Sequence, residues 1–193
     1  SGLNRWQIQT EVIGAVLDRR TTFLEERLAA DRLIPYGNLG TAMGRQTVQE
    51  AVSLARLAVR EAGGRLQPQR LVYRDGSPQV AGNIIVNAEG SLQVLVMPTE
   101  LKGRPQHRLD AWVRATFAAA CGMRGDTLVV SKDGERAKVD RMPPMATDQA
   151  RAALDSLLHL CRQARMRPLP FGPKTSFAIF DAARQTLFLS RDR

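Results

Sequence analysis

Two apolar runs separated by a short turn constrain the fold of this chain more than any other feature. The first run covers residues 80–87, the turn covers 88–90, and the second run covers 91–97 and stops before Pro98. This pattern is typical of an antiparallel hairpin. The residues at the centres of the runs are apolar: Ile85, Val94, Val96 and Met97. A metal-dependent phosphodiesterase needs oxygen ligands at such positions, so we expect a structural core that holds no metal.

The rest of the chain mixes helical and strand periodicities. Apolar spacing predicts two helices within residues 4–31, followed by helices at 51–62, 104–121, from 147 onward and at 175–188. Further strands are predicted at 66–73, 127–130 and 137–141. The order of elements indicates an α+β or mixed α/β fold. We expect an N-terminal helical part at 1–62 and a sheet-and-helix core at 63–193, together forming one compact domain.

Local signals sharpen these expectations. Capping boxes at residues 22–25 and 47–50 predict helix starts. Proline and glycine predict loops at 33–40 and 167–173, and an Asp-Gly turn after residue 74. The run at 91–97 is apolar on both faces, which predicts a central strand covered on both sides. Side chains expected to face the core from the helices are Trp6, Leu109, Trp112, Val113, Phe117, Ala120, Cys121, Ala150, Leu154, Leu157, Leu158 and Cys161.

The composition narrows the class of protein. Hydrophobic residues make up 44% of the 193, which is enough for a core, and no apolar run is long enough to span a membrane. The N-terminus lacks the pattern of a signal peptide, and both ends suggest an excerpt from a longer polypeptide. Because there are two cysteines, we expect no disulfide framework and a cytoplasmic location.

The charge balance favours polyanionic or acidic partners. The net charge is +9, and all but four of the 28 basic residues are arginine. Arginine binds phosphate and carboxylate through two parallel hydrogen bonds. The basic residues are spread along the chain, but Lys102, Arg104, His107 and Arg108 cluster at a predicted helix start. These four are our candidates for DNA contact, and a solvated basic turn is the alternative.

Catalytic patterns are weak. Glu100 and Lys102 match the Glu-x-Lys half of a restriction-type nuclease signature, with Asp75 as the conceivable upstream acid. We expect Pro98 to end the strand before Glu100 and Asp75 to lie in a turn, which disfavours both. The glycine-rich segment at 37–44 lacks the Lys and Ser/Thr of a phosphate loop. The histidines and cysteines show no spacing typical of a metal site or a nucleophile, so we predict no catalytic residue, metal or cofactor.

Four segments carry a family resemblance. They are residues 3–9, 33–40, 97–103 with Leu-Asp-Ala-Trp at 109–112, and Arg-Pro-Leu-Pro-Phe at 167–171. In this order they resemble the C-terminal region of the RecC family, the gamma chain of exodeoxyribonuclease V in the RecBCD helicase–nuclease. The resemblance extends from about residue 3 to about residue 180, and the block at 97–112 and the proline-rich connector are its most specific parts.

The resemblance implies a restriction-endonuclease-like core whose active site has been lost. It places Ile85 at the first acid, Val96 at the second acid and Pro98 at the lysine of the related nucleases. It also implies a non-catalytic role in homologous recombination and DNA repair, with RecB and RecD subunits and forked or duplex DNA as partners. A shift of two residues would bring Glu100 and Lys102 into register, so an active nuclease stays open as an alternative. A protein-interaction module without DNA contact is the third reading.

Overall fold

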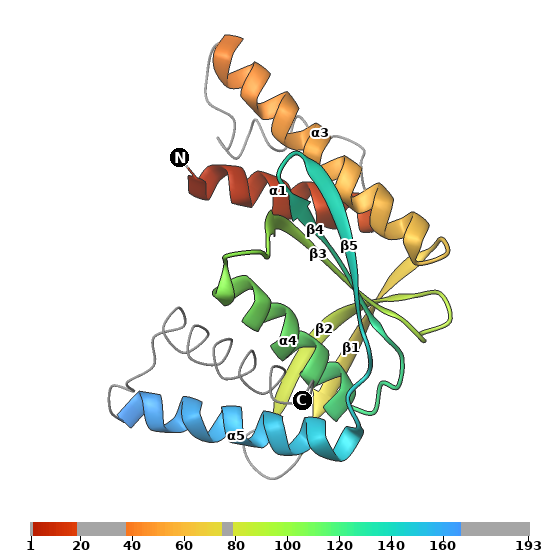
Figure 1. The fold of residues 1–193 in the computed structure, drawn as a ribbon, viewed down its shortest axis with the longest axis vertical. Helices are drawn as coiled ribbons and strands as arrows, with labels where there is room; N and C mark the ends of the chain where they lie inside the picture. Colours follow the sequence, from red (N-terminus) through yellow and green to blue (C-terminus); the bar gives the residue numbers. More distant parts are fainter. Residues whose placement is uncertain (1, 19–37, 75–78, 167–193) are drawn as a thin grey trace, which may run out of the picture.

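The structure is a computed structural model that describes residues 2–18, 38–74 and 79–166 (Figure 1). Its helices are α1 (Gly2–Leu17), α3 (Asn38–Glu61), α4 (Pro105–Ala120) and α5 (Thr147–Met166). Its strands are β1 (Leu66–Tyr73), β2 (Val80–Asn87), β3 (Gln93–Glu100), β4 (Thr127–Asp133) and β5 (Arg136–Met142). The described part of the chain is therefore α+β, with the order of helices and strands that the sequence predicts.

The five strands form one mixed sheet in the order β1-β2-β3-β4-β5. The pairs β1–β2, β2–β3 and β4–β5 are antiparallel, whereas β3 and β4 are parallel. Parallel neighbours cannot be joined by a tight turn, and α4 makes the crossover between them.

Helices cover the two faces of the sheet unequally. Helices α1 and α3 pack together on one face of β3 and β4, and α4 lies on the other face with α5 beside it (Figure 1). One core cluster joins Leu54 and Ala58 of α3 to Val94 of β3 and Leu128 of β4. The N-terminal helices therefore share a core with the sheet.

Strands β3 and β4 are sealed on both sides. Residues 93–95 of β3 and 127–131 of β4 are buried without interruption. A half-exposed strand would alternate buried and exposed residues instead. The prediction of a doubly covered central strand is confirmed, because α3 packs on Val94 while the α4 side holds Leu95 and Val129.

The turn between β2 and β3 is fixed by Asn87 and Gly90. The side-chain oxygen of Asn87 accepts hydrogen bonds from the backbone N–H groups of Ser91 and Leu92, at 2.9 and 3.0 Å. Gly90 has φ +68°, a conformation that glycine adopts without a steric penalty. The predicted hairpin is confirmed.

Several predicted boundaries are wrong, among them those of α3 and β3. Helix α3 begins at Asn38, so residues 38–40 are helical and Thr47 lies inside a helix that it was expected to begin. Strand β3 continues through Pro98 to Glu100. The register of β3 against β4 shifts between Val96 and Glu100, and irregular pairing of this kind tolerates a residue that has no N–H to donate.

Several side chains lie elsewhere than expected. Trp6 is 53% exposed and is not a core anchor, and Cys161 is exposed instead of facing inward. Helix α4 buries Ala120 as predicted, but its other buried residues were not predicted: Ala111, Thr116, Ala118 and Ala119. Small residues let this helix approach the sheet closely, and Phe117 packs against Gly82 of β2.

Other expectations fall on residues outside the described part. They concern the capping box at 22–25, the loop at 33–37, the turn that contains Asp75, the connector at 167–173 and the helix at 175–188. Within the part that the structure does describe, no helix combines the length and the apolar character needed to cross a membrane.

Candidate functional site

The candidate site is the junction where β2 separates from β3. Strand β2 pairs with β1 along all eight of its residues, but it pairs with β3 only through Ile85↔Val94 and Val86↔Gln93. Beyond these two pairs the strands diverge, with α4 on one side of the opening (Figure 1). A hairpin that splays at its centre can present side chains from both strands to one ligand, so we asked what this junction holds.

The junction between β2 and β3 holds apolar side chains. Ile85 and Val96 both pack against the cluster formed by α3, β3 and β4, and Val96 also contacts the cluster between α1 and α3. Pro98 is half-buried, and the described core clusters do not include it. Two of the three positions at which the resemblance places nuclease residues therefore share one face of the sheet and lie against the underside of α3.

The Glu-x-Lys match lies at the end of β3. Glu100 is the last residue of the strand, which corrects the expectation that Pro98 separates it from the sheet. Its side chain is exposed and accepts a hydrogen bond from the backbone N–H of Gly134 in the β4–β5 turn, at 3.1 Å. Lys102 is exposed in the turn that follows. The carboxylate of Glu100 thus connects the end of β3 to the β4–β5 turn.

A polar network beside this strand end was missed at the sequence level. Glu50 of α3 accepts hydrogen bonds from Lys132 of β4 at 2.9 Å and from Arg5 of α1 at 2.8 and 3.1 Å. Gln9 and Gln46 each contact the same carboxylate at 3.4 Å. Lys132 and Glu50 keep only 18% and 23% of their side chains exposed. Arg5 is 45 residues from Glu50 and Lys132 is 82, so no local pattern signals the network.

The charge of Glu50 is stabilised by its partners. Burial by itself would raise the pKa of this carboxyl group. The hydrogen bonds and positive charges of Lys132 and Arg5 outweigh burial and hold the pKa below its ordinary value of 4.5. Glu50 is therefore ionised at neutral pH and neutralised by two cations, which leaves it a structural link between helix and sheet.

No described residues form a metal site. Across residues 2–18, 38–74 and 79–166, no group of three or more His, Cys, Asp or Glu side chains could hold a metal ion. His107 lies near the start of α4, and His159 is on α5, where its ring contacts Gln163 at 2.8 Å. Burial raises the pKa of the Cys121 thiol, which disfavours the reactive thiolate.

The basic candidates form one continuous segment. Lys102 and Arg104 lie in the turn between β3 and α4, where Gly103 has φ +70°. Arg104 precedes the first residue of α4, and its carbonyl accepts the backbone N–H groups of His107 and Arg108. Lys102, Arg104 and Arg108 are exposed and His107 is half-buried. The turn therefore gathers the four residues, and their contact with DNA stays a prediction.

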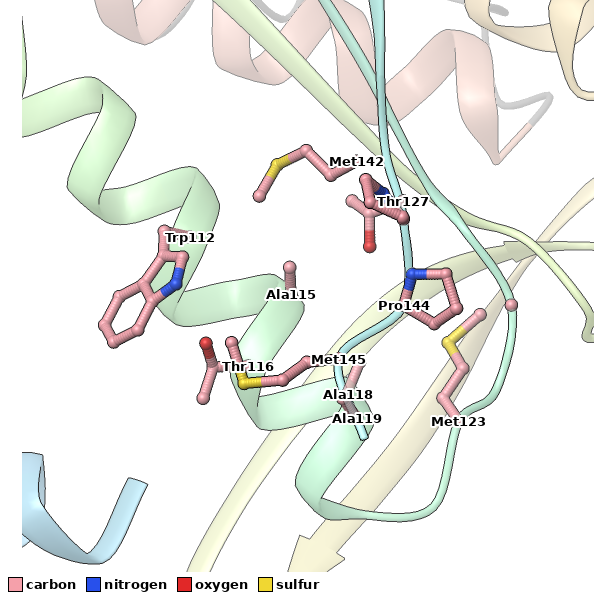
Figure 2. Close-up of a pocket in the computed structure, with 12 residues that line it drawn as sticks. Trp112, Ala115, Thr116, Ala118, Ala119, Met123, Thr127, Met142, Pro144 and Met145 are labelled. Carbon is pink, nitrogen blue, oxygen red and sulfur yellow. The ribbon is translucent and has the colours of Figure 1, made fainter. Parts of the chain in front are cut away.

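A small cavity of about 40 Å³ lies between α4 and the ends of β4 and β5. Its lining includes Trp112 and Thr116 of α4 and, from the end of β5 and the segment after it, Met142, Pro144 and Met145 (Figure 2). The Thr116 hydroxyl is buried and has no hydrogen-bond partner among the described residues. The side chains that line the cavity include no acid, base or thiol, so the cavity offers no catalytic group.

Comparison with known proteins identifies the family. The family model of the RecC C-terminal domain matches residues 1–184. The chain belongs to the RecC C-terminal domain family. It is 29% identical over 184 residues to the RecBCD enzyme subunit RecC of Escherichia coli (strain K12). The match covers 92% of this chain but 15% of that subunit, so the chain corresponds to a small part of its relative.

Proposed function

We propose that this domain is a non-catalytic architectural and DNA-handling part of a RecC-type subunit. In this role it helps to position a DNA fork during double-strand-break repair and docks RecB-like and RecD-like subunits. Its family membership supports the RecC context, and its net charge of +9 favours a polyanionic partner.

One observation carries the non-catalytic part of the proposal. At the junction where β2 leaves β3, Ile85 and Val96 pack under α3. A divalent cation would need carboxylate oxygens there and a path to solvent. Apolar side chains against a helix provide neither, so the proposal assigns this junction to core packing.

We propose further that the fold is a degenerate restriction-endonuclease-like core. The support is the helix α3, the antiparallel run β1-β2-β3, the crossover helix α4 and the parallel strand β4. The splayed β2–β3 pair lies at the position that the resemblance gives to the lost acids. On this proposal, evolution has kept the scaffold of a nuclease and replaced its metal ligands.

An assay for nuclease activity tests the proposal. The full-length protein is incubated with linear DNA and Mg²⁺ or Mn²⁺, alone and together with its partner subunits. We expect no cleavage that depends on residues of this domain. Metal-dependent cleavage that is lost in Glu100→Ala and kept in the matched variant Glu89→Ala, at an exposed turn, would contradict the proposal.

The alternative of an active nuclease has one observation in its favour. Because β3 reaches Glu100, Glu100 and Lys102 flank the end of a central strand. The hydrogen bond from Gly134 to Glu100 and the absence of an acidic cluster among the described residues weigh against it. The same cleavage assay decides between the two readings.

The third reading is a protein-interaction module that never contacts DNA. Binding to forked DNA is measured against salt concentration, because each phosphate contact steepens the dependence by about 0.7 to 0.9 log units. We expect Lys102→Ala, Arg104→Ala and Arg108→Ala together to flatten the slope. A protein that binds its partner subunits but shows no salt-dependent DNA binding would support the interaction module.

A further inference from the structure

The described helices cover the ribbon formed by β1 and β2 on one face only. Its covered face packs on α4 and α5: Tyr73 and Val80 lie in the cluster with Ala119 and Leu154. Ile84 and Val86 pack on Ala118. At Gly82 a Cβ atom would lie 3.2 Å from the Phe117 ring, which shows how close α4 lies to β2.

The register defines the opposite face. Paired residues of an antiparallel ribbon point to the same side, and the pairs here are Pro68↔Ile85, Arg70↔Asn83 and Val72↔Ala81. Ile85 reaches the cluster under α3. The other five side chains are exposed, so α3 covers the base of this face and leaves the rest open (Figure 1). We call Arg70, Val72, Ala81 and Asn83 the open ribbon face.

Two exposed arginines lie on the open ribbon face or directly next to it. Arg70 lies on it, and Arg74, also exposed, follows the end of β1. Neither strand of the ribbon contains an acidic residue. Among the described residues, Arg70 and Arg74 form no ion pair, in contrast to Arg5, Arg60 and Arg114. Two arginines that form no ion pair with a described residue, one on β1 and one directly after it, complement a polyanion.

The dimensions also suit a nucleic-acid strand. Arg74 lies four residues after Arg70 and one residue beyond the end of β1. Four residues of extended chain span roughly 13 Å, and this spacing lets the two guanidinium groups contact different phosphates of one strand. Val72 lies between them and is 38% exposed, and Asn83 lies opposite Arg70. Ribbons of two strands are known to contact DNA through such faces.

We infer that the open ribbon face binds a DNA strand through its phosphate backbone, with Arg70 and Arg74 as the phosphate contacts. The inference rests on the proposed DNA-handling function and adds a second surface to the turn at residues 102–108. Ile85 is the next residue on this side of β2 after Asn83, so the bound strand passes beside the junction, where the described residues form no metal site. The domain thus guides DNA across a site that does not cut it.

The test compares charge-matched variants of the full-length protein. Arg70→Gln with Arg74→Gln removes the two contacts. Arg124→Gln with Arg165→Gln removes two exposed arginines from the loop after α4 and from the end of α5. Binding to a fork with single-stranded tails is measured over a range of salt concentrations. For two lost contacts we expect the slope of log K against log salt to flatten by about 1.4 to 1.8 units, with the control unchanged.

Two further experiments test whether a loss of DNA binding comes from the lost charge or from disturbed folding, and whether the partner of this face is DNA or protein. Arg70→Lys with Arg74→Lys keeps the charge and should retain most of the slope. A photo-crosslinking residue at position 72 should react with DNA, whereas the same residue at Leu160, exposed on α5, should not. Crosslinking of position 72 to a protein instead would overturn the inference.

The outcomes distinguish the inference from the function on which it rests. If the wild-type protein binds DNA and the Arg70/Arg74 pair leaves the slope unchanged, the open ribbon face is wrong and the proposed function stands. Equal losses in the target and control pairs also overturn the inference, because they indicate a general effect of charge. If the wild-type protein binds no DNA, the proposed function fails and this inference fails with it.

Discussion

The two halves of the sheet differ in how they are covered. Strands β3 and β4 lie between α3 on one side and α4 on the other, and they bury almost every central side chain. Strands β1 and β2 are covered on one side, and the open ribbon face remains exposed. The halves meet at two residue pairs beside Ile85. In a sheet of this kind the two halves differ in what they contribute. The covered half, β3 and β4, supplies most of the buried core that stabilises the fold, and the half-open part, β1 and β2, is accessible to a partner.

The sealed half should be far less tolerant of truncation than the open half. Leu128 of β4 is fully buried in the main core cluster, so Leu128→Ala should lower the free energy of unfolding by about 2–5 kcal/mol. Val72→Ala on the open ribbon face should cost about 0.5 kcal/mol or less. Chemical denaturation measures both. Similar losses from the two changes would mean that the ribbon face is covered in the intact protein.

The polar network around Glu50 extends this comparison to the attachment of the helices. Glu50→Gln keeps the shape of the side chain but removes the charge that Lys132 and Arg5 neutralise. Because a partly buried lysine then lacks its partner, we expect a loss of about 1–3 kcal/mol in unfolding free energy. The matched change Glu61→Gln breaks a more exposed pair with Arg60 and should cost about 0.5 kcal/mol or less.

The pH dependence of the Glu50 contribution follows from its lowered pKa. A carboxyl group whose pKa is lower in the folded than in the unfolded state stabilises the fold above the unfolded value. The contribution of Glu50 is thus fully present above about 4.5 and is lost as the pH falls through the lower folded pKa. The stability difference between the wild type and Glu50→Gln should shrink below pH 4.5. A difference that grows on acidification would contradict this assignment.

A hydrogen bond between β1 and α5 helps to attach the half-open part of the sheet to the helices. The hydroxyl of Tyr73 donates a hydrogen bond to the carboxylate of Asp155 at 2.8 Å. Tyr73→Phe should therefore cost about 0.5–1.5 kcal/mol. A double-mutant cycle with Asp155→Ala isolates the pair. An interaction energy near zero would show that apolar packing alone attaches the ribbon to α5.

The sequence predicted the strands better than their surroundings. Alternation and turn residues are local, so β1, β2 and the Asn87–Gly90 turn were found from neighbouring residues. Pro98 was taken as a strand end because the irregular pairing that accommodates it depends on β4. Trp6 was assigned to the core because a large aromatic side chain is more often a core anchor than a surface platform, and the sequence does not show which side of a helix a neighbour covers.

Some features of the candidate site could likewise be predicted from the sequence, and others could not. The apolar character of Ile85 and Val96 is visible in the sequence, and so is the absence of acids near them. The network of Glu50, Arg5 and Lys132 and the open ribbon face are not visible, because both arise from the packing of distant segments. Glu50 was assigned to a helix start because the capping-box pattern at residues 47–50 is local, whereas its partner Lys132 is 82 residues away.

The smallest predicted change in stability concerns two buried threonines. Thr127 is the first residue of β4, and Thr116 is on α4, the helix that packs against both halves of the sheet. Thr127 donates a buried hydrogen bond to Gln93 at 2.9 Å, whereas the buried hydroxyl of Thr116 has no partner in the part of the chain that the structure describes. Valine has nearly the shape of threonine, so Thr127→Val should destabilise by about 1 kcal/mol while Thr116→Val should stabilise by a similar or smaller amount. Opposite signs in thermal and chemical unfolding would support this difference. A loss of stability in both variants would mean that the Thr116 hydroxyl is bonded, for which a water in the cavity of Figure 2 is the candidate partner.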